Sequence, residues 1–344
     1  MKQFSIIRQR IVWSLAGVMF LAILLLPVGA LADGVKWKFN NILPEARPET
    51  GILKKFAELA KENTKGQVDI KIYSGGSLGV KAVDTLRWLP KGFPETGLIW
   101  VNYLARDARQ IANVYPDGVV GTDKEHDLAV PVVEQILFDE LRNWKIEPFG
   151  TIRYAGSTVS VFSRNEPIKS LDALKKKKLR VWSKHQVATF KKLGIAAVIV
   201  PQSELYVALK TGVVDCALYP NGLIPSVSLQ EVVKYRSKLF TMGAAPMILG
   251  ASAKKWQKLS KENQDLVRAA AMAVRDDFLK IVPKIRAFSE KKMAEGGVEH
   301  IADFSDSDRE AFLAAAIENW KETSAKISST ALQNSEKILK AIGR

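Results

Sequence analysis

Apolar and polar residues alternate with two different periodicities between residues 35 and 72. Residues 35–39 and 68–72 alternate apolar and polar side chains, which is the period of a half-buried strand. Between them, apolar residues at 52–60 recur at helical spacing. That helix should end near Gly66, because glycine readily adopts the left-handed conformation of a helix cap. The order strand–helix–strand predicts the beginning of an α/β sheet.

The middle of the chain passes from uneven patterns to a regular alternation of elements. Its spacing predicts a buried strand at 97–102, a loop at 114–121, a helix at 127–144 and two short strands within 149–162. Between 167 and 220, strands alternate with short helices that end at glycines. Because consecutive parallel strands need a crossover connection, this alternation predicts a largely parallel sheet.

Helix start and stop signals dominate the second half of the sequence. Ser203 is placed to cap the helix that follows it, and Ser307 with Glu310 has the spacing of a capping box. Beyond residue 250 the pattern is almost wholly helical, and Pro283 should kink or interrupt one of these helices. From Glu310 to Ala341 the spacing predicts one or two long amphipathic helices.

Composition narrows the class of protein. The chain has 344 residues, 47% of them hydrophobic, which excludes global disorder and suggests two lobes or domains. Its formal net charge is +15, but no basic stretch is interleaved with stacking aromatics, so we expect no nucleic-acid partner. The single cysteine, Cys216, excludes an internal disulfide. Three widely separated histidines offer no metal site, and no cofactor motif is present.

The first 32 residues have the layout of a secretory signal peptide. Residues 1–10 carry three basic residues and no acidic one, and residues 11–32 carry no charge. Pro27 and Gly29 then break the apolar helix before Ala30-Leu31-Ala32, a small-x-small cleavage site. We expect cleavage after Ala32 and a periplasmic mature protein. The alternative is an uncleaved membrane anchor, since the uncharged stretch is long enough to span a bilayer.

Several motifs stand out along the mature chain. They are Asn63–Val68, Gly75–Gly79, Leu174-Lys-Lys-Lys-Lys-Leu-Arg180-Val, Leu193-Gly194 and Ser203-Glu-Leu-Tyr-Val-Ala-Leu-Lys-Thr-Gly-Val-Val-Asp215. These motifs resemble those of one family, the solute-binding proteins of tripartite ATP-independent periplasmic (TRAP) transporters of the DctP type. The resemblance covers essentially the whole mature chain and is most specific in its last motif.

The resemblance implies an α/β, bilobal type II periplasmic-binding-protein fold. Such a fold has two mixed, mostly parallel sheets flanked by helices, with long helices at the C-terminal end. We expect residues 33–155 to form lobe 1, with a return segment at about 246–280, and residues 156–245 to form lobe 2. The helices in 281–344 should pack across both lobes.

The resemblance also implies a non-catalytic function. Members close their lobes over a small organic carboxylate and deliver it to TRAP membrane permease subunits, which use an ion gradient and no ATP. We therefore expect transport without a cofactor, and a monomer rather than a dimer, although some relatives pair through a long C-terminal helix.

Arg180 is the first candidate for ligand binding. In the family, the arginine at this position of the Lys-x-Arg-Val strand forms a paired salt bridge with the ligand carboxylate. A guanidinium suits that role because its planar fork of donors matches two carboxylate oxygens, which lysine cannot reproduce. Taken without the resemblance, Arg180 is better read as a surface arginine at the end of a strand, and the resemblance reverses that preference.

Four further residues are candidates for the pocket. Tyr219 stands where the family has an asparagine that often touches the carboxylate, and Asn221 follows two residues later. Tyr219, Trp100 and Trp182 are each predicted either to line the pocket or to pack in the interior. If aromatic rings line the site, the ligand should carry a hydrophobic or aromatic body. Arg153 is the nearest arginine to the position where sialate-binding members have a second one, so sialate is disfavoured.

Two rival functions remain open from the sequence. An enzyme on a similar scaffold would need a nucleophile with a base, a metal cluster or a cofactor motif, and none can be assembled. A receptor for an ABC importer or a sensor kinase would share the same fold. Neighbouring genes would separate these, since a permease with large and small subunits favours TRAP transport and an ATPase favours ABC import.

Overall fold

The computed structural model describes residues 34–43, 45, 47–154, 157–200 and 202–344. The predicted signal peptide and its cleavage site lie outside the described residues. The fold is that of one compact unit, Lys36–Arg344. Within the described ranges, every helix is too short or too polar to cross a bilayer.

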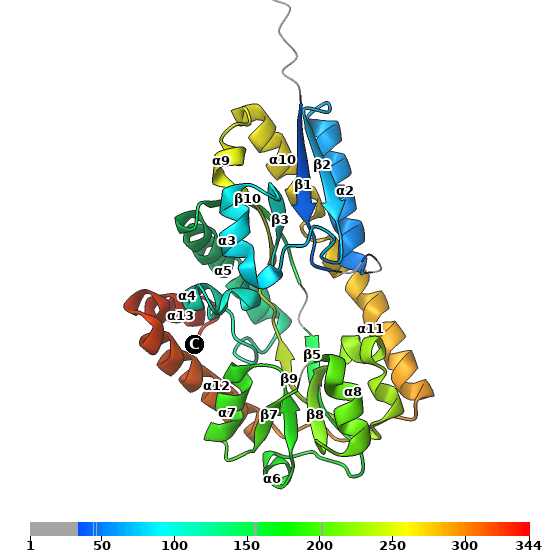
Figure 1. Ribbon diagram of the computed structural model, residues 1–344. Coiled ribbons are helices and arrows are strands. Elements are labelled where there is room, and N and C mark those ends of the chain that lie inside the picture. Colours follow the sequence, from blue (N-terminus) through cyan, green and yellow to red (C-terminus); the bar gives the residue numbers. More distant parts are fainter. Residues whose placement is uncertain (1–33, 44, 46, 155–156, 201) are drawn as a thin grey trace, which may run out of the picture. The chain divides into compact units, whose positions relative to one another are not determined.

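The first sheet has the strand order β2-β1-β3-β10-β4 (Figure 1). β1 pairs in parallel with β3, whereas β10 runs antiparallel to both β3 and β4. Since β10 follows all but the last strand of the second sheet in sequence, the chain leaves the first sheet after β4 and later returns to it. Its strands are β1 (Val35–Asn40), β2 (Val68–Tyr73), β3 (Thr96–Ile99), β4 (Ile146–Ile152) and β10 (Met247–Ser252).

The second sheet has the order β11-β9-β5-β8-β6-β7. β6 lies parallel to β7 and β8, as the alternation of elements predicts, but β5 runs antiparallel to β8 and β9. Both sheets are therefore mixed, with a larger share of antiparallel pairs than expected. The strands are β5 (Ser157–Ser163), β6 (Leu179–Val181), β7 (Ala197–Ile199), β8 (Cys216–Pro220), β9 (Tyr235–Met242) and β11 (Glu299–His300).

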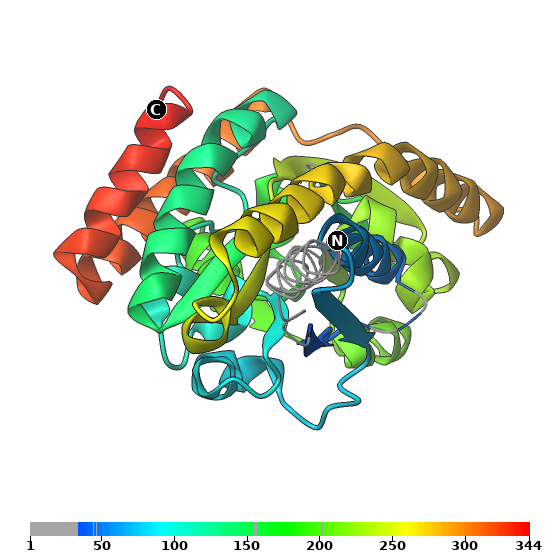
Figure 2. The same ribbon diagram turned by 90° about the horizontal axis from the view of Figure 1, so that it is seen from above.

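Helices flank both sheets, and α13 lies alongside α5 (Figure 2). The α-helices are α2 (Pro48–Asn63), α3 (Thr85–Trp88), α4 (Arg109–Ala112), α5 (Asp123–Asn143), α6 (Leu171–Lys175), α7 (Lys184–Lys192), α8 (Gln202–Thr211), α9 (Ala253–Trp256), α10 (Lys261–Val274), α11 (Asp277–Glu295), α12 (Asp306–Ile327) and α13 (Ser329–Ala341). The 3-10 helices are η2 (Ala82–Asp84), η3 (Leu89–Lys91), η4 (Val101–Leu104), η5 (Asn221–Val227) and η6 (Leu229–Glu231). Two mixed sheets flanked by helices, with long C-terminal helices, confirm the predicted fold class.

The long helix α12 contributes side chains to two apolar cores. Phe312 packs in the cluster built on β5, β6 and β8, where its ring stacks on Phe240 at a centroid distance of 4.7 Å. Two turns later, Trp320 is buried in the cluster that includes Ile99 of the first sheet. Its indole Nε1 also donates a hydrogen bond of 2.7 Å to the carbonyl of Asn113. A single helix thus joins the hydrophobic interiors of both sheets.

Two predicted helix caps are wrong. Helix α8 begins at Gln202, so Ser203 lies inside its first turn rather than at its N-cap. Helix α12 is capped by Ser305, whose hydroxyl accepts a hydrogen bond of 3.1 Å from the amide three residues on, and not by Ser307 with Glu310. Two serines here each precede an acidic residue at the same spacing, so the motif alone does not decide which one caps the helix.

Two predicted boundaries also differ from the structure. Helix α11 continues through Pro283, and the preceding helix ends instead before Asp276. One proline removes only one helical hydrogen bond, and buried residues on both sides of it hold the helix in place. The strand expected at 97–102 ends at Ile99, which leaves Trp100 outside the strand as the N-cap of η4.

Gly150 marks the closest approach of β4 to α10. A Cβ atom placed on Gly150 would lie 2.4 Å from the Cβ of Ala271, closer than two carbon atoms can approach. We therefore expect Gly150→Ala to lower the free energy of unfolding by about 1–3 kcal/mol through overpacking. Urea denaturation followed by circular dichroism measures this change.

A second-site variant provides the control for this prediction. Adding Ala271→Gly removes the opposing methyl group and should recover part of the loss, although glycine within a helix itself costs about 1 kcal/mol. A Gly150→Ala protein as stable as the wild type, or a double variant less stable than either single one, would contradict the predicted contact.

Candidate functional site

Arg180 lies in the middle of β6 with its side chain buried, at 1% exposure of the residue. Its Nε donates a hydrogen bond of 3.0 Å to the carbonyl of Val200, and its Nη1 donates one of 3.2 Å to the carbonyl of Leu218. These carbonyls come from the segments on either side of β6, so the sheet itself holds the guanidinium. The remaining nitrogen, Nη2, donates no hydrogen bond to the described residues. The alternative of a surface arginine does not apply to this side chain.

The positive charge of Arg180 has no acidic partner. Among the described residues, no Asp or Glu forms an ion pair with it. Burial lowers the pKa of Arg180 to about 10, with a smaller opposing effect from Tyr219, so the group stays protonated at neutral pH. A buried charge is destabilising unless an opposite charge compensates it. The site therefore favours the binding of an anion.

Two aromatic rings flank the Arg180 guanidinium. Its Cζ lies 5.6 Å from the ring centroid of Tyr219 and 5.8 Å from that of Trp182, distances at which a ring face attracts a cation. Tyr219 is buried in an apolar cluster, yet its hydroxyl has no hydrogen-bond partner within 3.5 Å among the described residues. Burial raises the pKa of Tyr219, while the Ser226 hydroxyl and Arg180 act in the opposite direction. Tyr219 thus combines packing with an unpaired hydroxyl next to Arg180.

The other two sequence candidates lie on different elements. Asn221 begins η5 directly after β8, and its buried Oδ1 also has no hydrogen-bond partner among the described residues. Its carbonyl accepts a hydrogen bond from Ser289 of α11. Trp100 is half-buried, and its ring meets that of Tyr154 edge to face at 5.8 Å. The described contacts do not join Trp100 to Arg180 directly.

A buried ion pair near these residues was missed by the sequence analysis. Glu49, in the first turn of α2, is fully buried and receives two hydrogen bonds from Arg47, from Nε at 3.1 Å and from Nη2 at 2.6 Å. The Tyr154 hydroxyl donates a third hydrogen bond to Glu49. Burial alone would raise the pKa of Glu49, but the hydrogen bonds from Arg47 and Tyr154 outweigh it and lower the pKa.

This ion pair acts electrostatically on the Arg180 group. The Arg47 guanidinium lies near enough to Tyr219 to contribute to lowering the pKa of its phenol. Helix α11 connects the two parts, because Phe278 at its start packs on the Tyr154 ring at 4.4 Å and Ser289 bonds to Asn221. Pro48 at the first helical position and an acid in the first turn are readable signals of a helix start. Nothing in the sequence signals that this start contacts Tyr154.

Trp182 is held in place by a hydrogen bond to Asp117. The indole Nε1 of Trp182 donates a hydrogen bond of 2.8 Å to Asp117 Oδ2, and Gln186 Nε2 approaches the same oxygen at 3.5 Å. Burial raises the pKa of Asp117 to about 6, against a smaller lowering effect of the Trp182 hydrogen bond. The loop that carries Asp117 is fixed by Arg344, whose Nη1 donates to the Val119 carbonyl at 2.6 Å. A loop between α4 and α5 therefore positions a ring beside Arg180.

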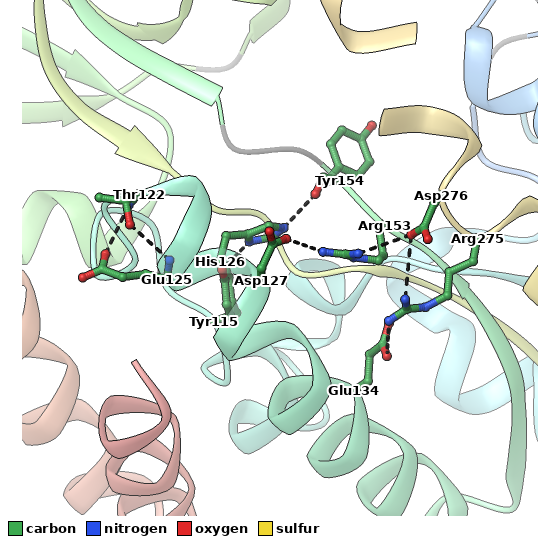
Figure 3. A network of polar contacts seen from close by, with 10 residues as sticks. All are labelled: Tyr115, Thr122, Glu125, His126, Asp127, Glu134, Arg153, Tyr154, Arg275 and Asp276. Carbon is green, nitrogen blue, oxygen red and sulfur yellow. Dashed lines mark hydrogen bonds and ion pairs between the residues drawn. The ribbon is translucent and has the colours of Figure 1, made fainter. Parts of the chain in front are cut away.

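Figure 3 shows a polar network where the chain leaves β4. His126 is buried, with Nδ1 at 2.6 Å from the Tyr115 hydroxyl and Nε2 at 2.7 Å from the Tyr154 carbonyl. Burial lowers the pKa of His126, so the ring is neutral and bridges these two groups. Arg153 forms ion pairs with Asp127 and, at 3.4 Å, with Asp276. Arg153 is thus charge-compensated, unlike Arg180.

Other parts of the described chain offer weaker candidates for a binding or reactive group. A groove between α5 and α13 is open to solvent and contains none of the candidate residues above. The described residues contain no cluster of His, Cys, Asp and Glu suited to a metal ion. Cys216 is buried in β8, and burial raises the pKa of its thiol, which makes it a packing residue rather than a nucleophile. The buried, unpaired Arg180 remains the strongest chemical feature.

Comparison with known proteins gives consistent matches over most of the chain. Residues 39–327 match the family model described as bacterial extracellular solute-binding protein, family 7. The chain is 27% identical over 274 residues to the 2,3-diketo-L-gulonate-binding periplasmic protein YiaO of Escherichia coli K12, which covers 75% of this chain and 77% of the relative. It is 28% identical over 238 residues to the C4-dicarboxylate-binding periplasmic protein DctP of Rhodobacter capsulatus, covering 66% and 68%.

A solved structure agrees with these matches. A TRAP periplasmic solute-binding protein from Ochrobactrum anthropi aligns with a TM-score of 0.78 at 25% identity, covering 90% of this chain and 96% of that one. The family model, the relatives and this structure all describe solute-binding proteins rather than enzymes. The chain therefore belongs to family 7 of the bacterial extracellular solute-binding proteins, the DctP-type receptors of TRAP transporters.

Proposed function

We propose that this protein captures a small organic acid in the periplasm by pairing its carboxylate with Arg180, and delivers it to the membrane permease of a TRAP transporter. The observation that carries the proposal is the buried guanidinium of Arg180, which is held by two carbonyls and has no acidic partner among the residues that the structure describes. A ligand carboxylate would supply the missing countercharge and fit the fork of donors. The names of the two relatives, which specify diketogulonate and C4-dicarboxylates, support an organic acid as ligand.

The proposal includes closure of two lobes over the ligand. We assign residues 33–155 and about 246–280 to lobe 1, residues 156–245 to lobe 2, and residues 281–344 to helices that pack across both. A ligand that contacts both lobes only when they are shut shifts the equilibrium toward the closed state. Exclusion of water then strengthens the pair between Arg180 and the carboxylate.

The remaining candidates have subordinate roles in this proposal. Tyr219 and Asn221 each have a buried polar atom without a hydrogen-bond partner among the described residues, and we assign these atoms to bonding with the ligand. Trp182 orients the guanidinium from beside it, and Trp100 lines the far wall together with Tyr154. The mature protein begins after Ala32 and acts as a monomer.

Binding of purified protein to small carboxylates tests the proposal. The protein is unfolded, dialysed to remove any ligand that co-purifies, refolded, and mixed with a panel of hydroxy, keto, sugar and aromatic acids. An acid at 1,000 times its Kd should stabilise the fold by about 4 kcal/mol, which a thermal-shift assay detects. The amides of the same acids are the matched controls and should have no effect. If neither the panel nor mass spectrometry of the untreated protein identifies an organic acid, the proposal fails.

A further inference from the structure

Asp117 and Arg180 both contact the same indole, that of Trp182. The indole Nε1 donates a hydrogen bond of 2.8 Å to Asp117 Oδ2, and the ring centroid lies 5.8 Å from the Cζ of Arg180. A hydrogen bond to an ionised acceptor is stronger than one between neutral groups, and it weakens steeply as its angle departs from linearity. Because the indole is rigid, this bond fixes the ring that lies beside the guanidinium.

Gln186 supports the same contact from α7. The residue is 1% exposed, and both ends of its side-chain amide are used. Its Oε1 accepts a hydrogen bond of 3.0 Å from the Trp182 backbone, while its Nε2 approaches Asp117 Oδ2 at 3.5 Å. The Gln186 backbone amide donates to the hydroxyl of Ser183, which caps α7. Gln186 therefore holds the Trp182 backbone, and Asp117 holds its ring.

The loop that carries Asp117 is itself held in place. Gly118 has a φ of +86°, and a Cβ atom there would lie 2.7 Å from the Phe312 ring of α12. Only glycine combines that backbone angle with so close an approach. One residue later, the Val119 carbonyl accepts a hydrogen bond of 2.6 Å from Arg344. The Asp117 carboxylate thus has a fixed position, to which the indole is tied.

Among the described residues, no cation competes with the indole for Asp117. The donors that reach Asp117 are the neutral N–H groups of Trp182 and Gln186. Without Asp117 both donors lose this acceptor, and the Trp182 ring loses the bond that fixes its rotation. Ordering a side chain on binding consumes part of the binding free energy, so a site gains affinity when its side chains are ordered beforehand.

We propose that Asp117 is a positioning residue of the proposed ligand site. It fixes the Trp182 ring beside Arg180 before a ligand arrives, and in this way it raises the affinity for the ligand without touching it. The inference rests on the proposed function and extends it to a loop that carries none of the pocket candidates. In the lobe assignment proposed above, Asp117 belongs to lobe 1 and Trp182 to lobe 2, so both lobes determine how the ring is placed.

A double-mutant cycle tests this role. Titration calorimetry at pH 7.5 with L-malate, pyruvate, D-galacturonate, orotate and the rest of the panel identifies the acid that the wild type binds most tightly. Asp117→Ala should raise the Kd of that acid about three- to tenfold, the cost of ordering one large side chain on binding. In the Trp182→Phe background, which lacks the indole N–H, the same change should alter the Kd less than about twofold. Asp139→Ala, at an exposed position on α5, is the matched control and should leave the Kd unchanged.

A conservative replacement and proton exchange separate positioning from a general structural role. Asp117→Asn keeps an oxygen that accepts from the indole, so its Kd should stay within about twofold of the wild-type value. In the ligand-free protein, NMR follows solvent exchange of the Trp182 indole proton, identified as the signal that Trp182→Phe lacks. This exchange should be at least about tenfold slower than in free tryptophan for the wild type and Asp117→Asn, and faster in Asp117→Ala.

Each outcome decides between the inference and the proposed function. Wild-type affinity in Asp117→Ala, an equal loss in the Trp182→Phe background, or an indole proton that exchanges as in free tryptophan would overturn the inference and leave the proposed function standing. If Asp117→Ala does not fold, proton exchange in the wild type and the affinity of Asp117→Asn decide the matter. Binding of no acid from the panel, or unchanged binding by Arg180→Ala, would instead reject the proposed function and the inference with it.

Discussion

Replacement of Arg180 by alanine is expected to abolish most ligand binding while leaving the fold intact. A buried pair between an arginine and a carboxylate loses about 3–5 kcal/mol when one partner is removed, which corresponds to roughly a 100-fold to several-thousand-fold increase in Kd. The ligand-free protein should melt at nearly the wild-type temperature. The two hydrogen bonds lost to Val200 and Leu218 are offset by removal of a buried, unpaired charge. Calorimetry with the acid found by the panel, together with circular dichroism, measures both effects.

Two further variants sharpen this prediction. Arg180→Lys retains the charge but not the planar fork, so it should lose most of the affinity. Arg236→Lys is the matched control, because Arg236 is also an arginine on the second sheet but is already paired with Glu290 through bonds of 2.8 and 2.6 Å. That variant should bind almost as the wild type does. Near wild-type affinity in Arg180→Ala would remove Arg180 from the proposed site.

Replacement of Asp117 by asparagine should stabilise the protein at neutral pH. The folded-state pKa of Asp117 is raised to about 6 from an ordinary value of 3.8, because burial disfavours the carboxylate. Above pH 6, Asp117 is therefore ionised in the folded protein, where its carboxylate is less stable than in the unfolded chain. This difference lowers the free energy of unfolding by up to about 3 kcal/mol. Asparagine keeps an oxygen that can accept from Trp182 Nε1 but carries no charge.

The pH dependence of this effect distinguishes it from a general change in packing. As pH falls from 6 to about 4, Asp117 takes up its proton in the folded state and becomes neutral, so the advantage of asparagine should fade. Thermal melts of both proteins at pH 7.5, 6, 5 and 4 follow the difference. Asp139→Asn, at an exposed position, should shift the melting temperature little at any pH. An Asp117→Asn protein that is less stable at pH 7.5 would contradict the prediction.

The sequence predicts best where local signals decide the structure. Between 167 and 220, glycine helix ends and alternating apolar residues each fall near an observed boundary. The helix cap at Ser307 fails for the opposite reason, since Ser305 offers the same local pattern two residues earlier. Where two equivalent signals compete, tertiary packing decides between them.

The same distinction between local motifs and long-range contacts applies to the candidate site. Arg180 is a candidate from the sequence because it lies in a short, specific motif, although its burial, and the absence of an acidic partner among the described residues, come only from the structure. The contact of Glu49 with Tyr154 joins positions 105 residues apart, and that of Asp117 with Trp182 joins positions 65 apart. No periodicity in one sequence connects such distant residues, so neither contact could be predicted.

Helix α12 constrains how ligand capture can proceed. Phe312 is buried in the interior of the second sheet and Trp320 in that of the first, so both sheets are attached to the same helix. A hinge motion that separated them by simple translation would have to extract one of these rings into water. We therefore expect the proposed lobe closure to keep both rings buried, with any bend of α12 confined to the stretch between Phe312 and Trp320.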